Sequence, residues 1–168
     1  MSVGKTTLVK ALKELSQFKD YKFATERSKY LNDLGIPLNT DSTLKGQTIF
    51  LAERCAELMN NDIITDRTVI DVMAFTMNAK SISHYDKEIF ENYAKEFVRE
   101  YDYIFYISPY GIPVEDNGVR ETDEHYRDLI DFTITTLIKR YSHMANKIEK
   151  ISGSTDERIE QILKFTNL

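Results

Sequence analysis

Residues 2–8 read Ser-Val-Gly-Lys-Thr-Thr-Leu, which is the second half of the pattern G-x-x-x-x-G-K-[ST]. Apolar residues then recur at helical spacing, so this segment predicts a loop that runs directly into a helix. Backbone N–H groups at such a junction bind phosphate, while Lys5 would reach the β- and γ-phosphates and the Thr6 hydroxyl would bind Mg²⁺. The residues expected at the phosphates are Ser2, Val3, Gly4, Lys5, Thr6 and Thr7. The alternative is a serine-capped helix that contains Gly-Lys-Thr by chance.

The length of 168 residues suits one domain with a single core, spanning 1–168. A net charge of −5 argues against broad, sequence-independent binding to nucleic acid. No stretch has the length of a membrane span or the layout of a secretory signal. Cys55 is the single cysteine, so it forms no internal disulfide, and it suits a packed helix face better than a nucleophile. These features favour a reduced, cytoplasmic setting.

Helical and strand-like segments alternate along the chain, which is typical of an α/β domain. Strands are expected over 21–25, 62–66, 103–107 and 148–151. Helices are expected over 6–18, up to 34, over 44–59, 72–80, 87–99 and 124–143, and from 155 onward. The segment 103–107 is apolar throughout, as in a strand that is buried on both faces of a parallel sheet.

Asp66 and Arg67 come at the carboxyl end of the second expected strand. Ligands of open α/β sheets bind at this edge, so the Asp66 carboxylate could hold Mg²⁺ or accept a proton, and Arg67 could bind an anionic substrate. A helix cap with a solvated neighbour is the alternative for this pair. Asp71 suits substrate contact and helix capping equally well.

Glu26 and Arg27 follow the first expected strand and should reach the same edge. Either could face the acceptor, and Glu26 is a candidate general base for an attacking hydroxyl. An exposed ion pair that contributes little is the alternative.

A polar, glycine-containing segment follows the third expected strand, and we expect a lid over about 110–127. Arg120 could close over the transferring phosphate and stabilise its charge. Arg127 could do the same, although for this residue a solvated position is an equal alternative. The alternative is a solvated loop whose arginines pair with nearby acidic residues.

Taken together, these segments resemble the P-loop nucleoside and nucleotide kinases. The resemblance is closer to the AAA-type NTPase branch that includes ribosylnicotinamide kinase domains and phage kinases acting on nucleotides or on 5-hydroxymethyluridine in DNA. It is carried by residues 2–8, 26–28, 66–68 with Asp71, 115–120 with 126–127, and 151–154. The resemblance implies that Gly153 and Ser154 lie near adenine. It also makes Gln47, seven residues before Arg54, a candidate reader of a base edge, with a surface glutamine as the equal alternative.

The chain departs from the resembled family at its start and at Thr68. The family's first strand, normally central in the sheet, and the first loop glycine would lie before Met1. We therefore expect the start to lie upstream, and the chain as given to expose strand edges, bind ATP weakly and associate, for example as a homodimer. Thr68 stands where many relatives have serine, which leaves a hydroxyl in place.

These interpretations predict a three-layered α/β P-loop fold with a central, mostly parallel sheet. The expected activity is transfer of phosphate from ATP, with Mg²⁺, to a nucleoside, a nucleotide or a related small acceptor. Two alternatives stay open: a kinase of 5-hydroxymethyluridine in DNA, which the acidic charge disfavours, and a nucleotide-binding switch without a small acceptor. The metal would lie between Thr6 and Asp66, and Glu26 and Arg67 would orient the acceptor.

Overall fold

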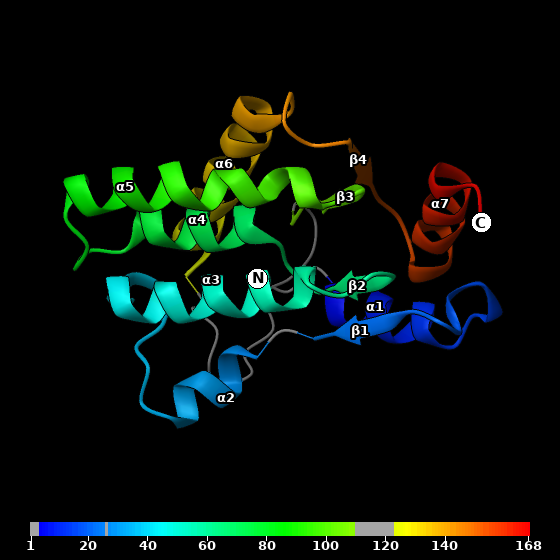
Figure 1. Ribbon diagram of the computed structural model, residues 1–168, viewed down its shortest axis with the longest axis horizontal. Helices are drawn as coiled ribbons and strands as arrows, with labels where there is room; N and C mark the ends of the chain where they lie inside the picture. Colours follow the sequence, from blue (N-terminus) through cyan, green and yellow to red (C-terminus); the bar gives the residue numbers. More distant parts are fainter. Residues whose placement is uncertain (1–3, 26, 110–122) are drawn as a thin grey trace.

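The computed structural model describes residues 4–25, 27–109 and 123–168 (Figure 1). Its helices are α1 (Lys5–Lys13), α2 (Ser28–Asp33), α3 (Leu44–Leu58), α4 (Val69–Asn78), α5 (His84–Ala94), α6 (Glu124–Tyr141) and α7 (Thr155–Thr166), with short 3₁₀ helices at Ser16–Phe18, Asn39–Asp41 and Lys95–Glu100. The strands are β1 (Lys22–Ala24), β2 (Ile63–Thr65), β3 (Tyr103–Ile107) and β4 (Lys147–Ile151). The expected alternation of helices and strands is confirmed.

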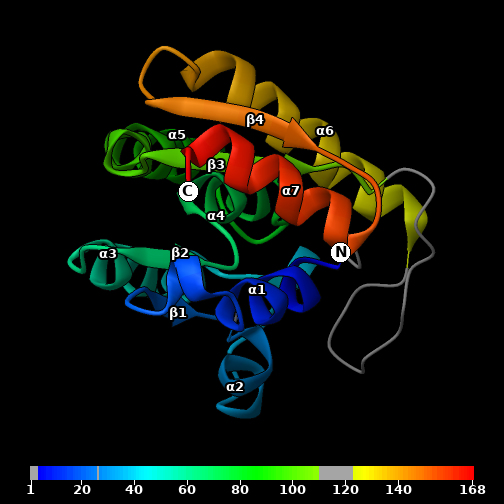
Figure 2. The same cartoon turned by 90° about the vertical axis from the view of Figure 1, so that its right-hand side faces the viewer.

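The four strands found in the described residues form two parallel pairs. β1 pairs with β2, with Ala24 opposite Thr65, and β3 pairs with β4, with Ile107 opposite Ile151. The pairs lie apart in Figure 2, and in the described residues no ladder joins β2 to β3. The single central sheet expected from the sequence is therefore found as two separate pairs, because no described strand lies between them.

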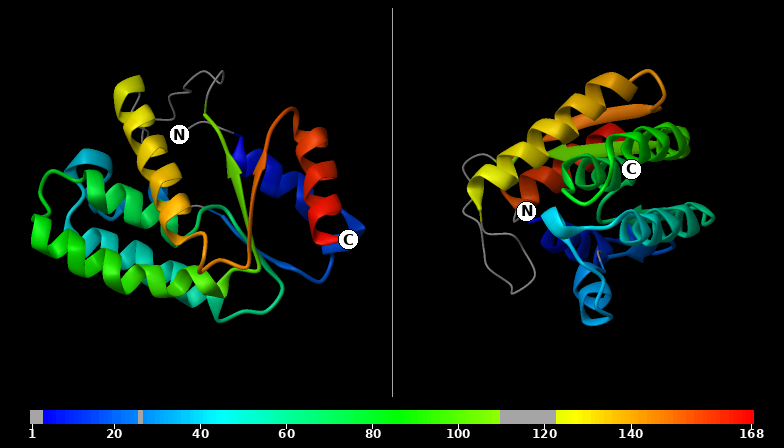
Figure 3. Two further views of the ribbon diagram at one scale, coloured as in Figure 1. Left: turned by 90° about the horizontal axis from the view of Figure 1, so that it is seen from above. Right: turned by 90° about the vertical axis from the view of Figure 1, so that its left-hand side faces the viewer.

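Helices cover both sides of the strands, which gives the expected three layers. Figure 3 shows α3, α4, α5 and α6 on one side and α1 and α7 on the other. Side chains of β3 alternate between the layers: Ile104 packs into the core beneath α4 and α6, whereas Phe105 and Ile107 pack toward α1 and α7. This alternation places the layer of strands between two apolar cores.

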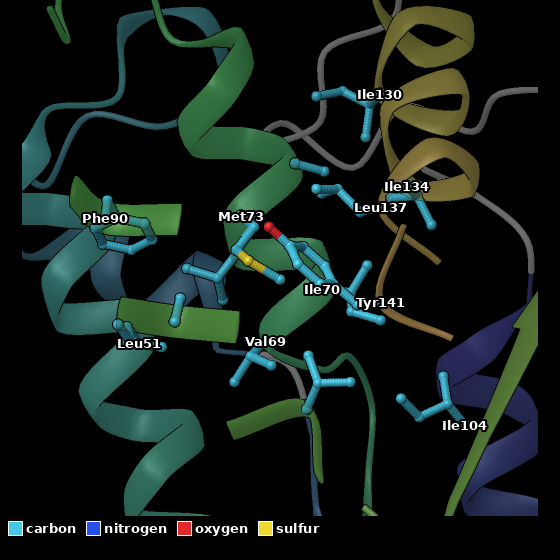
Figure 4. Packing of buried hydrophobic residues seen from close by; sticks show 14 of the residues in the cluster. Leu51, Val69, Ile70, Met73, Phe90, Ile104, Ile130, Ile134, Leu137 and Tyr141 are labelled. Atoms are coloured by element: carbon cyan, nitrogen blue, oxygen red, sulfur yellow. The ribbon is translucent and has the colours of Figure 1, made fainter. Parts of the chain in front are cut away.

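The larger core is centred on α4. Val69, Ile70 and Met73 are almost fully buried there, and Ile130 of α6 packs against them (Figure 4). Such a helix is apolar around most of its circumference because other helices enclose it. The described helices include none that is long and apolar enough to cross a membrane.

Candidate functional site

The loop before α1 has the geometry that its glycine predicts. Gly4 has a φ of 74°, in the left-handed region that favours glycine, and its carbonyl accepts the N–H of Leu8 at 2.9 Å. The amides of the first turn of α1 therefore stand at a helix N-terminus, where the helix dipole favours an anion. Ser2 and Val3 lie outside the described residues.

Thr6 and Asp66 meet at this end of the strands. The Thr6 hydroxyl donates a hydrogen bond of 2.7 Å to Oδ2 of Asp66, which is 2% exposed. The other carboxylate oxygen, Oδ1, is buried and has no hydrogen-bond partner among the described residues. A buried carboxylate with one oxygen held by a hydroxyl and one unused fits a hard cation such as Mg²⁺, which takes oxygen ligands.

Lys5, Asp66 and Arg67 line one cavity of about 900 Å³, together with Thr68 and Asp71. Thr7, which was also expected at the phosphates, is exposed on α1 and is not among the residues that line this cavity. The lysine expected at the phosphates and the carboxylate expected at the metal thus share a single space, although they are about 60 residues apart in the sequence. This juxtaposition is what the two sequence patterns predict.

Arg67 has an unusual backbone conformation, with a φ of 92°. Thr65 supports this turn by donating its hydroxyl to the Arg67 carbonyl at 2.9 Å, and the guanidinium lies 5.2 Å from the centre of the Phe75 ring. A non-glycine residue at positive φ is strained, and such residues cluster at functional sites. Arg67 is therefore held at the edge of the cavity by its neighbours.

Asp71 caps α4. Its Oδ2 accepts the backbone N–H of Thr68 at 2.9 Å, and the Thr68 hydroxyl accepts the N–H of Ile70 at 3.2 Å, which forms a capping box. From the sequence, substrate contact and helix capping had equal weight for Asp71, and these hydrogen bonds show that it caps the helix. A role in substrate binding stays a prediction for this residue.

Two of the expected acceptor residues, Arg27 and Gln47, are not among the residues that line the cavity with Lys5 and Asp66. Arg27 forms an ion pair of 3.2 Å with Glu53 and lies 4.6 Å from the ring centre of Tyr30. Gln47 is 3% exposed on α3, so the alternative of a surface glutamine is wrong. Glu26, the candidate base, lies outside the described residues.

The lid expected over 110–127 lies largely outside the described residues, and Arg120 lies there with it. The part of this segment that the structure describes, residues 123–127, forms the start of α6. The Asp123 side chain caps this helix by accepting the N–H of His125 at 2.9 Å. Arg127 is 13% exposed and contacts Asp128 at 3.2 Å.

Gly153 and Ser154 form the cap of α7. Gly153 has a φ of 95°, and a Cβ at this position would collide with the Glu157 carboxylate. Ser154 and Glu157 form a capping box, and these hydrogen bonds lower the pKa of Glu157. The structure thus explains the pattern Gly-Ser-x-x-Glu as a helix start, and proximity to adenine stays a prediction.

Two buried arginines were not assigned to the site from the sequence. Arg54 is 4% exposed on α3, and its Nη1 donates to the backbone carbonyl of Asp66 at 3.2 Å, while Nη2 donates to Glu57 at 2.7 Å. Burial raises the pKa of Glu57 to about 7, although Arg54 opposes this shift. Arg54 thereby fixes the strand end that carries Asp66.

Arg158 is the second buried arginine. It is 9% exposed on α7, and its Nη1 lies 3.3 Å from the position that a Cβ of Gly4 would occupy. Glycine at position 4 therefore lets this guanidinium approach the loop. The sequence signal was weak, because an arginine in the first turn of an amphipathic helix is usually solvated.

A loop with a left-handed glycine, a lysine and a threonine that enter a helix, and an aspartate at the end of a parallel strand define a P-loop NTPase. The sequence model of the AAA domain family matches residues 1–158, and the chain belongs to this family. Comparisons with curated proteins and with solved structures returned no match. Membership implies binding and use of a nucleoside triphosphate, and AAA domains typically bind it with Mg²⁺.

Proposed function

We propose that this domain transfers the γ-phosphoryl group of ATP to a nucleoside, a nucleotide or a related small acceptor. An oxygen of the acceptor forms a bond to the γ-phosphorus, the bond from that phosphorus to the bridging oxygen breaks, and ADP leaves. A hydroxyl acceptor gives its proton to a base of the protein. The observation that carries the proposal is the 2.7 Å hydrogen bond from Thr6 to the buried Asp66 carboxylate.

The residues of the loop bind and orient the triphosphate. The first amides of α1 face a phosphate group, and the Lys5 ammonium places a positive charge at the β- and γ-phosphates. The buried Arg158 guanidinium, beside Gly4, adds positive charge on the α7 side of the loop. Together these groups neutralise an anion that the acidic chain as a whole would repel.

Mg²⁺, when bound, neutralises charge that develops on the phosphate oxygens during transfer. The chain would hold it through the Thr6 hydroxyl and Oδ1 of Asp66. Arg54 keeps the backbone of Asp66 in place, so the carboxylate does not have to reorganise during the reaction.

The acceptor would lie at the carboxyl ends of β1 and β2. In this proposal Glu26 is the base, Arg67 and Arg27 bind the acceptor, and Gln47 and Asp71 contribute to its recognition. Arg120, with Arg127 from the start of α6, would close over the γ-phosphate. The acceptor class is supported by the resemblance of the segments 26–28 and 66–68 to nucleoside and nucleotide kinases.

A screen with γ-labelled ATP tests the proposal. Purified protein is incubated with Mg²⁺, ATP and panels of nucleosides, nucleotides and DNA that contains hydroxymethylated bases. Label that moves to a small acceptor, with ADP formed only when the acceptor is present, supports the proposal. Label on DNA alone would assign the base-modifying activity instead, and ADP formed at the same rate without any acceptor would assign an NTPase switch.

A further inference from the structure

The polar atoms of Asp66 are held from three directions. Its backbone N–H donates to the Ala24 carbonyl at 2.8 Å, its backbone carbonyl accepts Nη1 of Arg54 at 3.2 Å, and Oδ2 accepts the Thr6 hydroxyl at 2.7 Å. Oδ1 is buried and has no hydrogen-bond partner among the described residues. The bond from Arg54 fixes the peptide unit between Asp66 and Arg67, directly before the backbone turn with a φ of 92°.

Arg54 is held in turn by Glu57, one turn further along α3. Nη2 of Arg54 donates to Oε1 of Glu57 at 2.7 Å, and the two side chains are only 4% and 15% exposed. A guanidinium is planar, and its N–H groups point in fixed directions. The bond to Glu57 on one side therefore decides where Nη1 points on the other, which is toward the Asp66 carbonyl.

The surroundings of Glu57 set the balance between its ionised and neutral forms. Oε2 of Glu57 is buried and has no hydrogen-bond partner among the described residues. Burial favours the neutral form and raises the pKa of Glu57 to about 7; Arg54 and Arg27 oppose this shift, and Glu53 adds to it. The charged and titratable groups that face Glu57 come from α3, from the segment after β1 and from the residues before β3, and they are Arg54, Glu53, Arg27 and Tyr101. The one charged residue of α4, Asp71, acts on Tyr101.

We propose that Glu57 is a positioning residue of the nucleotide site, which in its ionised form orients Arg54 and thereby holds Asp66 ready for the metal ion. A hydrogen bond from a guanidinium to a carboxylate is roughly twice as strong as one between neutral groups. When Glu57 gains a proton, Arg54 is held less firmly and the peptide unit of Asp66 loses a fixed partner. The inference rests on the metal and nucleotide binding in the proposed function, and it does not depend on which acceptor is used.

A proton on Glu57 affects the fold and the site in opposite directions. Because burial raises the pKa of Glu57 to about 7, the free energy of unfolding falls as pH rises toward that value. Over the same interval the metal site gains, because the ionised carboxylate orients Arg54. A residue that served the fold alone would change stability and metal binding in the same direction.

The test measures the affinity of the purified chain for a fluorescent ATP analogue that is not hydrolysed, once with Mg²⁺ and once with EDTA. The ratio of the two affinities reports the contribution of the metal, and titration of the nucleotide itself is common to all variants. Measurements at pH 6, 7 and 8, beside urea unfolding, compare the unchanged chain with Glu57→Gln, which keeps the shape but does not titrate. Glu53→Gln is the matched variant one turn earlier on α3.

We expect the ratio for the unchanged chain to rise by at least about threefold more between pH 6 and pH 8 than the ratio for Glu57→Gln. Glu53→Gln should keep the rise but move it to lower pH, because the charge of Glu53 raises the pKa of Glu57. Arg54→Lys keeps the charge without the planar fork, and it should lower the ratio about tenfold at every pH.

Equal pH dependence in the unchanged chain and Glu57→Gln would overturn the inference, as would metal binding that simply follows stability from variant to variant. If Glu57→Gln does not fold, Glu53→Gln decides, since a rise that stays at the same pH would have another origin. An unchanged chain that binds the analogue equally with Mg²⁺ and with EDTA would overturn the metal site of the proposed function together with this inference. Metal-dependent binding without the pH effect would overturn the inference alone.

Discussion

The hydroxyl of Thr6 and the carboxylate of Asp66 are joined by a hydrogen bond of 2.7 Å across 60 positions of sequence. Thr6 lies in the first turn of α1 and Asp66 directly follows β2, so the bond fixes the phosphate loop relative to the edge where a metal ion would act. The sequence predicted both residues as metal ligands, and the structure adds that they contact each other directly.

Two substitutions at Thr6 distinguish the contribution of its hydroxyl from that of its side-chain volume. We expect Thr6→Val to reduce nucleotide use at least about 100-fold and to lower stability by about 1 kcal/mol, because the buried Asp66 carboxylate loses a partner. Thr6→Ser keeps the hydroxyl and should retain most of both properties. Turnover and urea unfolding measure the two effects, and equal behaviour of the valine and serine variants would contradict the assignment.

Lys5→Ala should abolish nucleotide use and leave the fold intact. The lysine supplies a point charge to the phosphates, whereas its neighbours Leu8 and Leu12 hold α1 in the core. Lys10→Ala, at an exposed position of the same helix, is the matched control and should be active. Single-turnover assays with circular dichroism measure this, and full turnover in a folded Lys5→Ala protein would remove the P-loop assignment.

Asp66→Asn should lower the rate far more than the affinity for nucleotide. The amide keeps the shape of the carboxylate but loses the charge that holds a cation during transfer. Asp62→Asn, at the other end of β2, is the control, since asparagine tolerates the φ of 49° found there. Nucleotide titration beside single-turnover rates measures the difference, and a variant that simply unfolds would favour a structural role.

Glu57 should make stability depend on pH. Burial raises its pKa to about 7 from an ordinary value of 4.5, with Arg54 and Arg27 opposing and Glu53 adding to the shift. The folded chain thus keeps the proton to higher pH than the unfolded chain, so the free energy of unfolding falls as pH rises from about 4.5 to about 7 and then levels off.

Glu57→Gln should remove this fall, which we expect to be on the order of 1–2 kcal/mol because solvent screens a half-buried group. The control is Glu88→Gln, at an exposed position of α5. Urea unfolding at pH 5, 6, 7 and 8 measures the effect. A pH profile of Glu57→Gln that parallels the unchanged protein would assign the dependence to other groups.

Local patterns predicted most of the elements. The strand over 103–107 has the expected bounds, and α3 ends one residue before the expected position. The first helix was expected to reach residue 18 but ends at Lys13, because Leu15 adopts an extended conformation that turns Phe18 into the core. α4 begins at Val69 rather than at residue 72, since Thr68 and Asp71 cap it, a signal that the sequence carried.

Pairwise relations across the fold were harder to predict. The contact of Thr6 with Asp66 followed from the two patterns, but the burial of Arg54 and Arg158 did not, because it depends on what α3 and α7 pack against. The exposed strand edges, by contrast, were expected from the sequence, and among the described strands β1–β2 and β3–β4 form separate pairs.

The positive φ of Arg67 means that stability and turnover favour different residues at position 67. Glycine would adopt the same backbone at no steric cost, whereas arginine bears a strain of about 1–3 kcal/mol. Screening random variants for heat resistance alone should therefore enrich glycine at position 67, and screening for turnover should restore arginine. Arginine at this position is therefore the better residue only where its guanidinium contributes more to turnover than its backbone strain costs in stability.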